Sequence, residues 1–229
     1  MKRKMSLCTL LILLAITLIV AGCGRDPETA GVLNGDGVLA GEPGENTVLI
    51  ESSGRLVTRR YDFTGFDHLA VEFFDVDIRQ GESYAVVIEV EENALPYIQV
   101  MQEAGRLHLG LDPEHTYNMT DVPLRAAVTM PALAALDLSM SDASTITGFH
   151  SEDDLVLILD LSSGLAGDLV ANDLVCDLSL GSTLALSGSG RVVTILAALG
   201  STVDLTNFAV EDAQVTADNS SEVTVATGG

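Results

Sequence analysis

Carboxylates recur at one position of a repeated four-residue sequence in the C-terminal half of this chain of 229 residues. Asp137, Asp160 and Asp177 each lie between two apolar residues, and a serine follows two positions later. If the copies stack about 4.8 Å apart, as neighbouring strands do, adjacent carboxylates repel by about 0.9 kcal/mol in water, or about 3.5 kcal/mol at an effective dielectric constant of ~20. Solvation, a raised pKa of one carboxyl group or a bound cation would reduce the repulsion in such a ladder of stacked carboxylates.

Calcium is a cation that suits such a row of carboxylates, because it takes oxygen ligands. We therefore hypothesise weak calcium binding, in the millimolar class, by Asp137, Asp160 and Asp177. The alternative is a solvated acidic face without bound metal, which the absence of a glycine-rich calcium nonapeptide favours. No other cofactor is predicted.

No other residues have the spacing of a catalytic or metal site. The histidines lack metal-ligand spacing, no Gly-x-Ser-x-Gly motif is present, and the glycine-serine clusters lack the lysine of a phosphate-binding loop. Cys176 takes a position that leucine holds in other copies of the repeat, so we expect a small buried hydrophobe rather than a reactive thiol. We therefore predict that the chain is not an enzyme.

The four-residue sequence returns often enough to define a repeat. Its third position falls at residues 138, 161, 178, 197 and 217, so that successive copies are 17 to 23 residues apart. Within each copy the side chains alternate as in a strand, and glycine-serine turns follow most copies. A strand-like repeat of this length predicts the stacked coils of a β-solenoid. The copies are Leu136–Ser139, Leu159–Ser162, Cys176–Ser179, Ile195–Ala198 and Val215–Asp218.

The first half of the chain also favours strands. Its apolar residues alternate with polar ones, and no long amphipathic helix is visible. We therefore predict an all-β fold, a right-handed parallel β-helix with coils of about 20 residues. The strands expected in the first half are Arg55–Tyr61, His68–Arg79, Tyr84–Glu91, Arg106–Leu111 and Leu124–Met130, with a helical turn within Glu92–Tyr97.

The N-terminus carries a targeting signal. Basic residues at positions 2–4 precede an apolar run over residues 5–21, and small residues precede Cys23. The run is shorter than the roughly 20 residues that span a bilayer, which favours a cleaved signal peptide over residues 1–22, the alternative being an uncleaved signal anchor. The pattern resembles a bacterial lipobox. This resemblance implies cleavage before Cys23, lipidation of Cys23 and a membrane anchor of two or more acyl chains.

The rest of the chain divides into a tether and a folded domain. Residues 23–53 are expected to form the lipidated cysteine and a flexible acidic tether, because glycine, proline and acids are frequent and no hydrophobic period is sustained. A short strand at Thr47–Ile50 is the alternative for the end of this segment. Residues 54–229 are predicted to form the β-helix domain.

The mature chain is strongly acidic. Without the three basic residues of the signal, eight arginines remain against 33 acids, a net charge of −25. From residue 137 onward there are 14 acids and one base, Arg191. Such a surface repels nucleic acids and anionic lipid headgroups and attracts metal cations or basic partners. No binding to nucleic acid is expected.

Several short motifs follow one another in a distinctive order. They are Phe66, Val71, Gln80-Gly81, Asn93-Ala94-Leu95, Gly105–Leu109, Val128–Leu133 and Leu136–Ser139, followed by the glycine-serine coils. In this order they resemble the head GIN domain family of putative auto-transporter adhesins, over roughly residues 54–229. The resemblance implies an exported β-helix without an established enzymatic activity.

These features together predict a lipid-anchored adhesion or interaction module that is exposed on the cell envelope and has no catalytic activity of its own. It would be attached to the membrane through its N-terminal lipid, and its partner would be an extracellular or periplasmic protein or glycan. One alternative is a β-helix polysaccharide-active enzyme. A glycosidase of this kind would need two convergent carboxylates. The other is a structural envelope protein that acts through a protein partner.

Overall fold

The computed structural model describes residues 46–226. These residues form strands, turns and one short 3₁₀ helix, η2 (Leu95–Tyr97), and contain no α-helix, so the all-β prediction is confirmed. The predicted signal peptide and Cys23 lie outside the described residues. The strands are β1 (Thr47–Glu51), β2 (Leu56–Tyr61), β3 (His68–Glu72), β4 (Asp75–Gln80), β5 (Ala85–Glu91), β6 (Ile98–Glu103), β7 (Arg106–Leu111), β8 (Thr116–Thr120), β9 (Leu124–Met130), β10 (Ala135–Ser139), β11 (Ser144–His150), β12 (Leu155–Asp160), β13 (Gly164–Leu178), β14 (Thr183–Ala197), β15 (Thr202–Ala217) and β16 (Glu222–Val225).

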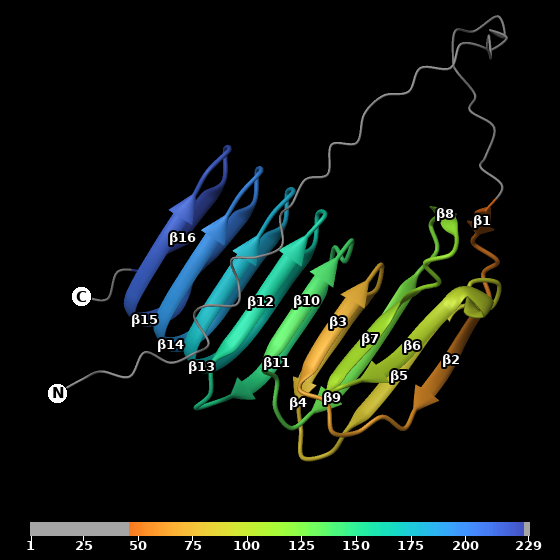
Figure 1. Cartoon of the computed structure of the whole chain (residues 1–229), viewed down its shortest axis with the longest axis horizontal. Coiled ribbons are helices and arrows are strands. Elements are labelled where there is room, and N and C mark those ends of the chain that lie inside the picture. Colours follow the sequence, from red (N-terminus) through yellow and green to blue (C-terminus); the bar gives the residue numbers. More distant parts are fainter. Residues whose placement is uncertain (1–45, 227–229) are drawn as a thin grey trace, which may run out of the picture. The chain divides into compact units, whose positions relative to one another are not determined.

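Most strands belong to one curled sheet with two faces (Figure 1). The first face contains β6, β7, β3, β10 and β12, and the second contains β2, β5, β9, β4 and β11. The long strands β13, β14 and β15 belong to both, because their N-terminal halves extend the second face and their C-terminal halves extend the first. Each coil therefore runs along the first face, turns, and returns along the second.

The strands that begin the fold do not all run parallel. Strands β3, β4, β7 and β9 to β16 pair with one another in parallel. By contrast, β5 is antiparallel to both β2 and β9, and β6 is antiparallel to β7. The sheet is therefore mixed, and the prediction of a parallel β-helix over all of residues 54–229 is not met in its first part. One cause is the turn between β6 and β7. Ala104 and Gly105 have φ angles of +47° and +81°, and a two-residue turn with two positive φ angles favours a tight antiparallel hairpin.

One predicted strand of the first half is divided in the structure, and the alternative prediction for residues 47–50 is confirmed. The sequence predicts one strand over His68–Arg79, but a turn at Phe73 and Phe74 separates β3 from β4. Phe73 has a φ of +68°, a conformation that bulky residues rarely adopt. A phenylalanine at this position therefore gives no sequence signal for a turn. The short strand at Thr47–Ile50 is present as β1, which pairs with β8 in a separate two-stranded sheet.

The coils stack in a register that differs from the predicted one at one copy of the repeat. Leu138 pairs with Leu159, and Leu159 pairs with Leu178. The column thus passes through Leu159, and the prediction that places Leu161 in it is wrong. The slip is two residues, and because side chains alternate with a period of two, it leaves the apolar pattern unchanged. Leu161 lies instead in the turn after β12 and is partly exposed.

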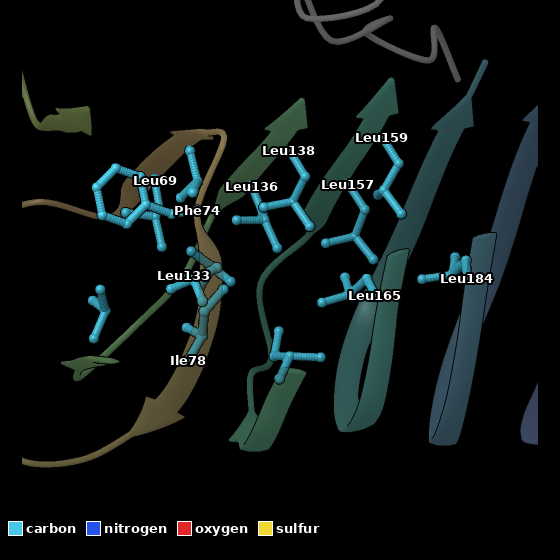
Figure 2. Close-up of a cluster of buried hydrophobic side chains, with 14 of the residues drawn as sticks. Leu69, Phe74, Ile78, Leu133, Leu136, Leu138, Leu157, Leu159, Leu165 and Leu184 are labelled. Carbon is cyan, nitrogen blue, oxygen red and sulfur yellow. The ribbon is translucent and has the colours of Figure 1, made fainter. Parts of the chain in front are cut away.

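Aliphatic side chains fill the space between the two faces. Leu136 and Leu138 of β10 lie beside Leu157 and Leu159 of β12 (Figure 2), and all four are fully buried. No single coil buries enough apolar surface to be stable alone, so each depends on its neighbours. Cys176 continues the column of Leu157, and burial raises the pKa of its thiol to about 12. The prediction of a small buried hydrophobe at this position is therefore confirmed.

Two glycines inside the long strands allow successive coils to approach closely. A Cβ atom at Gly167 would stand 1.8 Å from the carbonyl oxygen of Ile146, and one at Gly188 would stand 1.9 Å from that of Leu169. Both glycines also have positive φ angles, of 153° and 123°. No other residue type fits these positions without moving the backbone of the preceding coil.

The corrected register predicts opposite outcomes for two leucines of one repeat copy. Leu159→Ala removes a fully buried side chain and should lower the free energy of unfolding by about 2–5 kcal/mol. Leu161→Ala changes a side chain of the turn and should cost less than about 1 kcal/mol. Urea unfolding of both variants measures the difference. A larger loss for Leu161→Ala than for Leu159→Ala would contradict the observed register.

Candidate interaction surfaces

The outward side of the first face carries the three predicted aspartates, but not as one ladder. Asp137 pairs with Ile158, and Ile158 in turn pairs with Asp177. Asp160 lies two residues further along β12, opposite Ser139. The two-residue slip separates the carboxylates, so the predicted ladder on adjacent coils is wrong in its register.

Each of these carboxylates has its own surroundings. Nη2 of Arg106 lies 2.5 Å from Oδ2 of Asp137, and Oγ of Ser179 donates a hydrogen bond of 2.6 Å to Oδ1 of Asp160. Burial raises the pKa of Asp177, and the negative charge of Asp160 adds to this effect. Within residues 46–226, no group of three or more His, Cys, Asp or Glu side chains is placed to hold a metal ion. Calcium binding by the aspartates stays a prediction, as does lipidation of Cys23.

A hollow of about 780 Å³ lies on the outward side of the first face, over β6, β7 and the start of β3. His68 Nδ1 is 2.6 Å from Oδ1 of Asp67, and the Arg106 guanidinium is held by Asp137. His108 Nδ1 is buried without a hydrogen-bond partner. The hollow thus offers polar contacts, while its guanidinium is already paired with an acid. Its lining residues are His68, Met101, Gln102, Glu103, Ala104, Arg106 and His108.

A row of apolar residues lies along the turns that join the first face to the second. Three of these residues directly follow the ends of β3, β10 and β12, and the other two stand one residue beyond the ends of β13 and β14. The turns themselves lie in a row beyond the ends of β10, β12 and the coils after them (Figure 1). We call this row the apolar ridge, and its members are Phe73, Met140, Leu161, Leu180 and Leu199.

The leucines of the apolar ridge are exposed and strained. Leu161, Leu180 and Leu199 are 40%, 43% and 49% exposed, and the five ridge residues have φ angles between +51° and +68°. This left-handed conformation costs a residue with a Cβ atom roughly 1–2 kcal/mol and is mostly adopted by Gly, Asn and Asp. The next coil indeed has Asn219 at this position, with a φ of +47°. The exposed leucines therefore neither suit the backbone conformation of the turn nor contribute to the buried core.

Buried serines hold these turns in place. Ser163, Ser182 and Ser201 are fully buried, and each Oγ donates a hydrogen bond of 2.6 to 2.7 Å to the carbonyl oxygen three residues earlier. The hydroxyls of Ser163 and Ser182 also accept hydrogen bonds from the backbone N–H of the serine in the preceding coil. Because these bonds satisfy buried polar groups, the serines offset the strain of the leucines that precede them.

Acids flank the apolar ridge on both sides. Asp160 and Asp177 are on the outward side of the first face, since their neighbours in the strands point into the core. Asp142 and Asp204 line a shallow groove on the outward side of the second face. Arg191, the one base after position 137, is held by Asp173 at 2.5 Å. The ridge therefore lies in a negative electrostatic environment.

A family model described as "Putative auto-transporter adhesin, head GIN domain" matches residues 65–229, nearly all of the folded part. The chain belongs to this family. The resemblance inferred from the order of its motifs is thus confirmed. No curated protein shows significant sequence similarity to this head GIN domain protein.

Solved structures share the fold at low sequence identity. A putative adhesin from Parabacteroides merdae has 16% identity and a TM-score of 0.53, covering 72% of this chain and 78% of its own. A protein from Parabacteroides distasonis described as a putative lipid binding protein has 15% identity and a TM-score of 0.58, covering 78% and 85%. A putative adhesin from the same organism has 14% identity and a TM-score of 0.51, covering 72% and 79%. At these identities the likeness is one of fold. Within the described part of the head GIN domain protein, no helix has the length and hydropathy needed to cross a membrane.

Sequence reasoning missed both the hollow and the apolar ridge. His68 and His108 are far apart in the sequence, and only the pairing of β3 with β7 brings them to one surface. The ridge had a visible signal, because a leucine followed by Ser or Gly and then by Ser recurs at residues 161–163, 180–182 and 199–201. The glycine-serine part of this motif predicts a turn, whereas the leucine that precedes it marks the exposed surface.

Asp177 and Asp204 should give the stability of the head GIN domain opposite dependences on pH. Burial raises the pKa of Asp177, so Asp177→Asn should stabilise the fold at neutral pH, on the order of 0.5 kcal/mol for a partly exposed group, and the gain should shrink as pH falls through that raised pKa. The backbone N–H and the hydroxyl of Thr206 lower the pKa of Asp204. Asp204→Asn should therefore destabilise at neutral pH, and its loss should disappear as pH falls through the lowered pKa.

Urea unfolding at several pH values between acid and neutral measures both variants. The structure requires effects of opposite sign at neutral pH. Two variants that shift stability in the same direction would show that the environments of the two carboxyl groups differ from those described.

Proposed function

We propose that this head GIN domain protein is a lipid-anchored interaction module, exposed on the cell envelope and without catalytic activity of its own, which binds its partner through the apolar ridge. The observation that carries the proposal is the series Leu161, Leu180 and Leu199, three exposed leucines in left-handed backbone on successive coils. Strained residues persist where the surrounding structure holds them, and they cluster at functional sites. Contiguous exposed apolar residues mark interaction surfaces. Membership of an adhesin-like family supports a surface role.

The N-terminal sequence supports the anchoring part of the proposal. Basic residues, an apolar run and small residues precede Cys23 in the order of a lipoprotein signal. Two or more acyl chains on Cys23 would hold the protein stably at a membrane. The folded domain would then be attached to the membrane through the segment that follows Cys23.

We further propose that the coils from β3 onward wind as a right-handed β-helix, to which the antiparallel strands β2, β5 and β6 are added at one end. The in-register parallel pairing of β10, β12, β13, β14 and β15 supports this description. Crossovers between parallel strands of one sheet are right-handed in nearly all proteins.

Replacing the ridge leucines should separate binding from folding. The triple variant Leu161→Asn, Leu180→Asn, Leu199→Asn introduces the residue that the chain itself uses at Asn219 in the same turn position. Relief of left-handed strain should leave the melting temperature unchanged or raise it by a few degrees. Saturable binding of the protein to envelope and extracellular material, measured by pull-down and surface plasmon resonance, should fall at least about tenfold.

Leu196→Thr is the matched control, because Leu196 is exposed to a similar degree but lies within β14 rather than on the ridge. This variant should bind as the wild type does. Equal binding by the triple variant and the wild type would overturn the role of the apolar ridge.

The anchor has its own test in the Cys23→Ser variant. Loss of the thiol that carries the lipid should move the protein from the membrane fraction to the soluble fraction. Labelling with radioactive fatty acid, followed by fractionation, measures both effects. An unlabelled wild-type protein, or a variant that stays fully in the membrane, would contradict lipid anchoring.

A further inference from the structure

The backbone of the apolar ridge is already used within the protein. The N–H of Ser162 donates to the carbonyl oxygen of Leu180 at 2.9 Å, that of Gly181 to Leu199 at 3.0 Å, and that of Gly200 to Asn219 at 3.1 Å. A partner therefore cannot join the ridge by adding a strand, because strand addition needs unpaired backbone groups. Recognition at the ridge must take place between side chains.

The spacing of the ridge suits the side chains of a helix. Successive coils are about 4.8 Å apart, so the ridge extends over ~19 Å from Phe73, which is partly buried against the core, to Leu199. Its three exposed leucines extend over ~10 Å. An α-helix advances about 5.4 Å per turn, and an apolar stripe on one side presents one or two side chains in each turn. About four turns of such a helix would follow the whole ridge.

The charges beside the ridge favour a partner that carries positive charge. Asp160 and Asp177 lie on one side and Asp142 and Asp204 on the other, and Arg191 is paired elsewhere. A surface of this sign repels anionic membranes and a second copy of the same ridge. It attracts a partner whose apolar stripe is flanked by lysine and arginine.

We propose that the apolar ridge binds a basic amphipathic helix, with the apolar stripe of the helix on the leucines and its cationic side chains beside the flanking aspartates. This inference rests on the proposed function, because it names the chemistry of the partner that the ridge takes. Burial of the leucines against the helix supplies affinity. The aspartates make the ridge selective for a cationic partner.

Synthetic peptides of about 18 residues, or five helical turns, test the proposal on the purified full-length chain. One peptide has leucine at every third or fourth position and lysine elsewhere. A second has the same composition with the leucines scrambled, and a third has glutamate in place of lysine. Fluorescence anisotropy measures binding, and circular dichroism measures the helix formed. The first peptide should bind saturably and become helical, while the scrambled peptide should bind at least about tenfold more weakly and the glutamate peptide should not bind.

Variants of the chain locate the binding. The Leu161→Asn, Leu180→Asn, Leu199→Asn variant should lose at least about tenfold in affinity for the first peptide, whereas Leu196→Thr should retain it. The Asp142→Asn, Asp160→Asn variant should keep part of the affinity but show a weaker dependence on salt. Equal binding of the ordered and scrambled peptides would reduce the interaction to general charge attraction and overturn the proposal.

Two further outcomes would also overturn it. Neutral or anionic phospholipid vesicles that bind the wild type but not the triple variant would make lipid the occupant of the ridge. Self-association that the triple variant abolishes would make a second copy the occupant. If no peptide binds and the triple variant still loses its binding to envelope material, the helix proposal fails and the proposed function stands. If neither binding depends on the leucines, both fail.

Discussion

Each coil of this protein must place its side chains directly over those of the coil before it. Parallel pairing in register puts Leu138, Leu159 and Leu178 in one column. A slip of one residue would move the inward side chains of an entire strand to its outward side. No coil has a core of its own, so the register of one constrains the next. The spacing of 19 to 21 residues along this column, the bends at glycine and the serine turns all follow from this constraint.

The sequence predicts the all-β fold and the stacking of repeats, because alternation and recurring turns are local signals. It also places β7 and β9 at their observed positions. It misplaces Leu161 and the carboxylate ladder, because a two-residue slip is invisible to a pattern of period two. The antiparallel direction of β5 and β6 is missed, because strand direction depends on the hand of turns such as that at Ala104 and Gly105. The hollow depends on the pairing of β3 with β7, which local sequence patterns do not predict.

The turn that joins the two faces has an inner and an outer side with different tasks. Inside, Ser182 satisfies a buried carbonyl group and links neighbouring coils. Outside, Leu180 projects into solvent from a conformation that asparagine or glycine adopts more readily. The internal hydrogen bonds make the fold tolerant of the external strain. If the apolar ridge binds a partner as proposed, binding and folding would depend on adjacent residues but on separate interactions, and substitutions could separate them.

The contrast between this turn and the glycine positions has an evolutionary consequence. At Gly167 and Gly188 the neighbouring backbone leaves no room for a methyl group, so a substitution there would displace the preceding coil. The turn accepts Phe, Met, Leu and Asn within a single chain. If the apolar ridge binds as proposed, sequence change in these turns could alter what this edge of the molecule binds while the packing of the coils stays the same.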